Sequence, residues 1–307
     1  MSRIPAITAP GAVNHLPLAV FRSDCTATPA LDAEGAWQIE RECPAFYWAH
    51  SPSNRQAIER EQRFEAGDFD FLVLLFDEDF ERRVAHIDAP NYYALDARRA
   101  RDTYREAGQI PLLTHELDAL RQMRAALRNH STARLAFTGG ATERSLFWID
   151  RETGAWCKAR PAYTLPVGGY IVDYAATSSA NPDHARLAMA RNGWHLRGAW
   201  YLDAIDAVYG LRPKRVALIV QARTPPYLIS TCWIDDEDLG WGTLLARHAR
   251  AVFADCLQRR EWPGYRPIET PTVDGAFALQ LPPFERRALE LRHEAGGFEF
   301  TSGKTGT

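Results

Sequence analysis

The chain has 307 residues, 46% of them hydrophobic, which is enough for one large α/β domain or two small ones with a sizeable core. A formal net charge of −3 excludes binding to nucleic acid through overall positive charge, although a local basic groove remains possible. The sequence has no apolar run near the roughly 18 residues of a membrane span, so no membrane-spanning segment is expected. Its five scattered cysteines show no zinc-ligand or disulfide pattern, so we expect a cytoplasmic protein.

The first half of the chain is predicted to be mainly helical. Residues 1–30 are expected to form an irregular arm or a loop-rich edge, and residues 34–49 two short helices. The strongly apolar stretch Phe69–Phe76 fits either a strand or a helix. Helical periodicity then predicts helices over residues 96–108 and 113–128.

From residue 135 the pattern changes to short strands separated by turns. Three of them form a predicted meander, a helical stretch follows, and a strand pair precedes a last helix. These elements are, in chain order, residues 144–149, 155–163, 170–174, 183–208, 215–221, 227–234 and 238–258. The order predicts an α/β (α+β) domain with one central mixed sheet flanked by helices.

The chain shows neither an internal repeat nor a linker long enough to divide it. We therefore expect a single domain over residues 31–265. It would follow the N-terminal arm and precede a C-terminal extension over residues 266–307, which ends in a flexible Gly/Ser/Thr/Lys tail.

Two neighbouring predicted strands bring together the side chains of greatest chemical interest. Because side chains alternate along a strand, Lys158, Arg160 and Ala162 share one face, and Asp173 and Ala175 share a face of the next strand. Two-metal phosphodiester hydrolysis needs two or three carboxylates on Mg²⁺, with a cation beside the reacting phosphate. The strand pair has the layout of such a site, but alanines stand where a carboxylate and a lysine are needed.

The chain resembles the PD-(D/E)xK nuclease superfamily and, within it, the phage and prophage recombination exonucleases typified by exodeoxyribonuclease VIII. The similarity runs from about Ala33 to Tyr265 and rests on the order and spacing of several short segments. These are Cys43–Ala49, Gly67 with the apolar stretch after it, Glu143–Trp148, Thr153–Gly154, Cys157–Pro161, Gly193–Trp194, Ala199–Tyr201, Val220–Gln221, Pro225–Tyr227 and Trp262–Tyr265. The resemblance implies a restriction-endonuclease-like core with an N-terminal helical part, in which Phe69–Phe76 is a buried helix.

The departures from the family pattern are concentrated at the catalytic positions. The resemblance implies that Asp173 is a retained metal-binding carboxylate and that Tyr201 is also retained. Four other positions of the catalytic set are substituted. Phe71 stands for a histidine, Ala162 for an aspartate, Ala175 for the lysine and Arg197 for a glutamine.

Several of the remaining residues could rebuild part of the site. Glu143 could join Asp173 as a second, weak metal ligand, whereas Lys158 lies roughly 13 Å along the strand from Ala162 and is too far to replace the lysine. Lys158, Arg160 and Arg197 are instead predicted to hold a DNA phosphate where active relatives use metal, and Arg197 could also pair with Asp173.

Three functions follow from these residues. The first is a degenerate nuclease that binds double-stranded DNA ends, or a recombination annealing protein, without efficient cleavage. The second is an active 5′-to-3′ exonuclease with a displaced site, which would need Mg²⁺ or Mn²⁺. The third is a phage-encoded protein-binding module without a role on DNA. The resemblance further implies a ring-shaped homo-oligomer and a phage or prophage recombination setting.

Overall fold

The computed structural model describes residues 6–54, 80–142, 144–164, 170–265, 272–273 and 276–298. The predicted helix at Phe69–Phe76, which includes Phe71, and the candidate ligand Glu143 lie outside these residues. Met1–Gly264 form one compact unit and Tyr265–Thr307 form a second. The two units are described separately.

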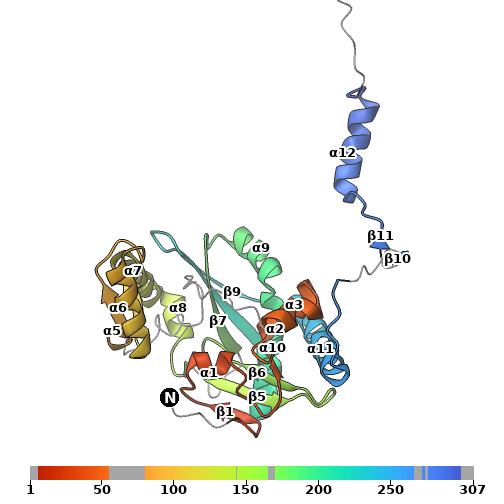
Figure 1. Ribbon diagram of the computed structural model, residues 1–307. Helices are drawn as coiled ribbons and strands as arrows, with labels where there is room; N and C mark the ends of the chain where they lie inside the picture. Colours follow the sequence, from red (N-terminus) through yellow and green to blue (C-terminus); the bar gives the residue numbers. More distant parts are fainter. Residues whose placement is uncertain are drawn as a thin grey trace, which may run out of the picture. The chain divides into compact units, whose positions relative to one another are not determined.

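The two larger sheets of the first unit (Figure 1) are linked by an antiparallel bridge between Tyr163 and Val172. One sheet has the strand order β1-β5-β6-β2 and the other β7-β8-β9. Their strands are β1 (Gly11–Val13), β2 (Ala30–Leu31), β5 (Ser145–Ile149), β6 (Trp156–Ala159), β7 (Tyr170–Thr177), β8 (Arg215–Ala222) and β9 (Ile229–Trp233). β7 and β8 are parallel whereas β5–β6 and β8–β9 are antiparallel, so the predicted mixed α/β class is confirmed.

The parallel pair β7–β8 requires a crossover, which two consecutive helices provide. α9 (Pro182–Asn192) begins at a proline after Asn181, whose side chain accepts a hydrogen bond from the backbone of Asp183. α10 (Trp194–Tyr209) follows after Gly193 alone. Gly193 has φ +62°, and a Cβ there would lie 2.4 Å from the Trp37 ring. The single helix predicted over residues 183–208 is therefore broken at this glycine.

Three further helices pack around α10 and the β5–β6 strands. They are α2 (Ala33–Arg41), α3 (Pro44–His50) and α11 (Asp236–Arg259), in agreement with the predicted helices at residues 34–49 and 238–258. Trp148, Trp200, Tyr201 and Phe253 fill the core between them. α10 and α11 approach so closely that a Cβ on Gly242 would lie 2.2 Å from the carbonyl oxygen of His195.

The opposite face of β7 and β8 is covered by a mainly helical segment over residues 80–136. Its elements are α5 (Phe80–Arg83), β3 (Val84–Ile87), α6 (Leu95–Glu106), β4 (Ile110–Leu113), α7 (Thr114–Asn129) and α8 (Ser131–Ala136). α6 and α7 match the predicted helices. The parallel pair β3–β4 was not predicted. α7 is fixed to the sheet by Gln221 of β8, whose side-chain nitrogen donates to the carbonyl of Met123 at 3.0 Å.

Of the two forms expected for residues 1–30, an irregular arm or a loop-rich edge, the described residues 6–30 fit the loop-rich edge. Within residues 6–30, β1 pairs with β5, and α1 (Leu18–Arg22) packs Phe21 against Phe147 and Trp156. The segment is ordered because it covers one face of the β5–β6 pair, a tertiary role that local sequence does not reveal.

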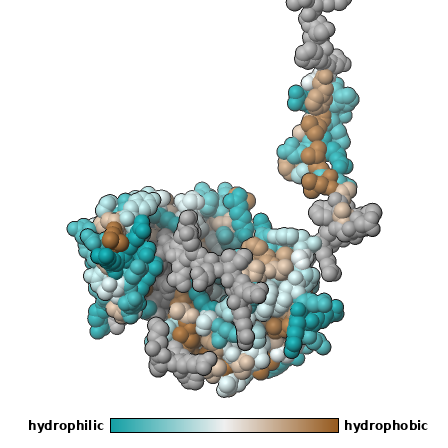
Figure 2. Space-filling view, in the orientation of Figure 1, coloured by the Kyte–Doolittle hydropathy of each residue, from teal (hydrophilic) through white to brown (hydrophobic). Residues whose placement is uncertain are grey.

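The second unit contains the hairpin of β10 (Thr272–Val273) and β11 (Ala276–Phe277) and the helix α12 (Pro283–Glu294). None of the residues of α12 is buried, and its hydrophobic side chains form a stripe along the helix (Figure 2). In the part of the chain that the structure describes, no helix combines the length and apolar character required to cross a membrane.

Candidate functional site

The candidate site lies where the two sheets meet. The bridge between Tyr163 and Val172 puts the next pair of residues, Ala162 and Asp173, at the same level of adjacent antiparallel strands. Ala175 follows two residues later on the same face of β7 as Asp173. Asp173 is 1% exposed, and both alanines are buried. The structure therefore brings together the positions that the family pattern assigns to two carboxylates and a lysine.

Arg197 supplies the counter-charge for Asp173 from the first turn of α10. Its Nε donates to Asp173 Oδ2 at 2.7 Å, and its Nη2 lies 2.6 Å from the same oxygen. Asp173 Oδ1 has no hydrogen-bond partner among the described residues. Of the two partners considered for Arg197 from the sequence, phosphate or Asp173, the structure shows the carboxylate.

The protonation states at this site follow from its burial. Burial by itself would lower the pKa of Arg197, but the charge of Asp173 and the hydrogen bond to Asp173 together raise it above its ordinary value. Burial, and next the charge of Asp173, raises the pKa of the Tyr201 phenol. Arg197 therefore stays cationic and Tyr201 neutral at physiological pH.

The side chains present do not fit a catalytic Mg²⁺ or Mn²⁺. Such an ion needs several oxygen ligands with negative charge, and here one oxygen of Asp173 is bound by a guanidinium while Ala162 and Ala175 offer no ligand atom. Among the described residues there is no group of three His, Cys, Asp or Glu side chains that could hold a metal ion. A cation of the protein itself occupies the space next to Asp173.

Lys158 in β6 and Arg160 just after it both contact the N-terminal segment, but their contacts do not fit the predicted role at a phosphate. Lys158 Nζ donates to the carbonyls of Phe21 at 2.7 Å and Ser23 at 3.2 Å. Arg160 Nη1 donates to the carbonyl of Leu16 at 2.6 Å. Both side chains are 3% exposed. The N-terminal segment covers both side chains. Lys158 binds carbonyls at the C-terminal end of α1, which lack helical partners, and Arg160 binds a carbonyl just before the helix begins.

A Lys158→Met protein is expected to lose about 2 kcal/mol in its free energy of unfolding, because the buried carbonyl of Phe21 and the partly buried carbonyl of Ser23 lose a donor. Urea unfolding followed by tryptophan fluorescence measures this loss. Lys214→Met, the same substitution at an exposed lysine, is the matched control. If stability is unchanged and DNA binding is weaker, Lys158 contacts a DNA phosphate, as the sequence predicted.

Tyr201 lies one helical turn beyond Arg197 and is 2% exposed, within the core between α10 and the β5–β6 strands. Its neighbour Trp200 donates from Nε1 to the carbonyl of Lys158 at 3.0 Å, which ties α10 to β6. These contacts fix the position from which Arg197 reaches Asp173.

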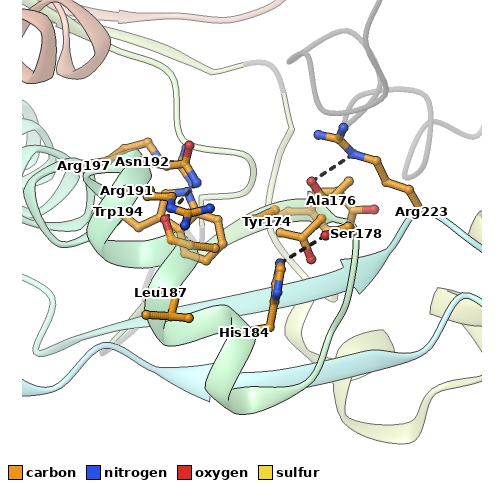
Figure 3. A pocket seen from close by; sticks show the side chains of 13 residues that line it. Tyr174, Ala176, Ser178, His184, Leu187, Arg191, Asn192, Trp194, Arg197 and Arg223 are labelled. Carbon is orange, nitrogen blue, oxygen red and sulfur yellow. Dashed lines mark hydrogen bonds between the residues drawn. The ribbon is translucent and has the colours of Figure 1, made fainter. Parts of the chain in front are cut away.

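A pocket of about 600 Å³ adjoins the site at the carboxyl ends of β7 and β8. Ala175 and Arg197 belong to its lining, and so do three basic residues that sequence reasoning did not single out: His184, Arg191 and Arg223 (Figure 3). The sequence offers a weak signal for them, because Arg191 precedes the helix break at Gly193 and Arg223 follows the end of a strand.

Comparisons with known proteins agree with this architecture. A family model described as a PDDEXK-like domain of unknown function (DUF3799) matches residues 41–268. A crystal structure from Eubacterium rectale, of a protein provisionally named an exonuclease, superposes with a TM-score of 0.52 at 11% identity, covering 80% of this chain and 91% of that one. LHK-Exo in complex with dAMP is less similar, with a TM-score of 0.23 at 13% identity and 62% and 91% coverage. Curated proteins gave no match.

Proposed function

This chain belongs to the PDDEXK-like domain family DUF3799, within the PD-(D/E)xK nuclease superfamily, and we propose that it binds DNA ends without cleaving them efficiently. The observation that carries the proposal is the Arg197–Asp173 ion pair, flanked by Ala162 and Ala175. The retained carboxylate is neutralised by the protein's own cation instead of being free for a metal.

The expected loss of cleavage is large. Removal of one electrostatic stabiliser typically lowers a catalytic rate by about 10² to 10³. This chain lacks an aspartate at Ala162, lacks a lysine at Ala175 and carries an arginine at position 197. Such losses are not additive, but together we expect them to leave little cleavage.

DNA binding is supported by the local distribution of charge rather than by the net charge of −3. The pocket beside the site is lined by Arg191, Arg197, Arg223 and His184, and its lining contains no Asp or Glu. Arginine suits phosphate because its planar fork can donate two hydrogen bonds to two oxygens. This groove replaces Lys158 and Arg160 as the proposed contact surface for phosphate.

The other parts of the proposal rest on the resemblance to recombination exonucleases. They are a cytoplasmic phage or prophage setting, a recombination annealing protein as partner and a ring of several copies. An active exonuclease with a displaced site, using Mg²⁺ or Mn²⁺ at Asp173 and Glu143, would require Asp173 to release Arg197.

The proposal is tested by incubating the protein with linear duplex DNA in Mg²⁺ or Mn²⁺ and by measuring DNA binding over a range of salt concentrations. We expect no shortening of the DNA, and affinity that falls as salt rises, because bound phosphates release counterions. Arg191→Ala combined with Arg223→Ala should reduce the slope of log K against log salt by about 2. Metal-dependent degradation, or the absence of DNA binding at low salt, would contradict the proposal.

A further inference from the structure

The helix α12 of the second unit has an apolar face that its own unit leaves exposed. None of its residues is buried, and the side chains of Phe284 and Leu291 are 71% and 50% exposed. A hydrophobic stripe runs along the helix (Figure 2). A helix of 12 residues gains little stability in water from its backbone alone, and most helices in proteins are stabilised by packing of an apolar face. The stripe is therefore a candidate surface for another helix.

The apolar residues of α12 have the spacing of a coiled-coil seam. Phe284, Ala288 and Leu291 are four and three residues apart, and Ala295 and Phe298 continue the same alternation just after the helix ends. This spacing places successive side chains on one side of a helix, where they can meet a second helix. From Phe284 to Ala295, large and small residues alternate along the seam.

This alternation of size selects the direction in which two such helices pack. In an antiparallel pair of α12 helices, Leu291 lies level with Ala288 of the second copy, and Phe284 lies level with Ala295 of the second copy. Every layer then combines one large and one small side chain, which fills space evenly. A parallel pair would place alanine against alanine and phenylalanine against phenylalanine, and would leave voids at the alanines.

Charged residues beside the seam favour the same direction. Glu285 lies in the first turn of α12 and Arg292 in the last, and in the part of the chain that the structure describes neither has an ion-pair partner. In an antiparallel pair, Glu285 lies beside Arg292 of the second copy, and the two-fold axis repeats this contact. In a parallel pair, Arg287 would lie beside Arg292 of the second copy, and the like charges would repel. Arg287 already pairs with Glu290 of its own helix at 3.2 Å, so the charges left for a second copy are Glu285 and Arg292.

We propose that α12 pairs with α12 of a second copy of this chain as a short antiparallel coiled coil. The contact is two-fold and closed, so it differs from the ring of several copies that the resemblance implies, in which contacts run head to tail. It is also independent of DNA binding, which is proposed for the first unit. Because the seam is only about two heptads long, we expect a weak dimer with a Kd on the order of 10 to 100 µM.

Sedimentation velocity of the whole protein between about 1 and 200 µM should show a shift from monomer to dimer. Leu291→Gln is expected to weaken the dimer about tenfold or more, because it removes a large apolar side chain from the seam. Leu289→Gln is the matched control. It makes the same substitution two positions away in the same helix, at a leucine that is 42% exposed and does not belong to the seam, so it should leave the Kd unchanged.

Reversal of the charges tests for the second copy directly. Glu285→Arg alone and Arg292→Glu alone should each weaken the dimer about tenfold, because each turns two attractive pairs into repulsive ones. An equimolar mixture of these two variants should recover dimer. In a pair of unlike copies, both contacts are again between opposite charges.

A protein that stays monomeric at about 200 µM would overturn the inference, because the stripe would then be covered by the first unit of the same chain or by a different protein. A dimer or a larger ring that Leu291→Gln leaves unchanged would also overturn it. So would equal effects of Leu291→Gln and Leu289→Gln, or a mixture of the charge variants that is no more dimeric than each variant alone.

Discussion

Replacement of Arg197 by alanine is expected to lower the free energy of unfolding by about 3 kcal/mol, because the Asp173 carboxylate would be left buried without its counter-charge. Asp173 is 1% exposed, and Arg197 makes the one ion pair that Asp173 has among the described residues, through two nitrogens on the same oxygen. The Arg197 side chain is 23% exposed, so water can partly replace it, and the loss should fall at the lower end of the range for broken buried pairs. Urea unfolding measures it.

A double-mutant cycle separates the ion pair from simple loss of packing. Asp173→Asn combined with Arg197→Gln removes both charges but keeps polar side chains of similar size. We expect this double variant to be more stable than Arg197→Ala, because it does not leave a buried charge unpaired. If the effects of Asp173→Asn and Arg197→Gln simply add, the two residues do not form a coupled pair in solution.

Sequence patterns predicted the helices and strands that have a clear local signal, namely hydrophobic periodicity or flanking turn residues. The strands β5 to β9 alternate or are strongly apolar and are bounded by turn residues, and the helices α6, α7 and α11 have clear helical periodicity. β3 and β4 have only four residues each and pair across a crossover that contains α6, so neither carries a recognisable local signal. α12 has a proline at its first position and a hydrophobic stripe, but no helix was predicted within residues 266–307.

The candidate site was predictable in its positions but not in its contacts. Strand alternation placed Lys158 and Arg160 on one side, and both do contact the same segment, but alternation does not predict which layer covers that side. The chain places residues 16–23 there, more than 130 positions away in sequence. Likewise, the partnership of Arg197 with Asp173 joins a helix to a strand 24 residues apart and depends on where Gly193 breaks the crossover. Contacts between segments so far apart in sequence are determined by tertiary packing, which local patterns do not reveal.

Restoration of the family residues should bring metal binding back. A triple variant with Ala162→Asp, Ala175→Lys and Arg197→Gln is expected to bind Mn²⁺ on the order of 100-fold more tightly than the unmodified chain. Two adjacent carboxylates would then share the ion, and the guanidinium that now lies 2.6 Å from Asp173 Oδ2 would no longer repel it. Isothermal titration with Mn²⁺ measures the affinity, after circular dichroism has verified that the variant folds with larger side chains at two buried positions.

Two matched variants identify the cause of that gain. The triple variant with asparagine in place of aspartate at position 162 has the same size without the charge, and it should bind Mn²⁺ no better than the unmodified chain. The double variant Ala162→Asp with Ala175→Lys, which keeps Arg197, should bind at least about tenfold more weakly than the triple variant, because the arginine competes for Asp173. Equal Mn²⁺ affinity with and without Arg197 would show that the guanidinium is not what keeps a metal away. The alanines alone would then explain the loss of the site.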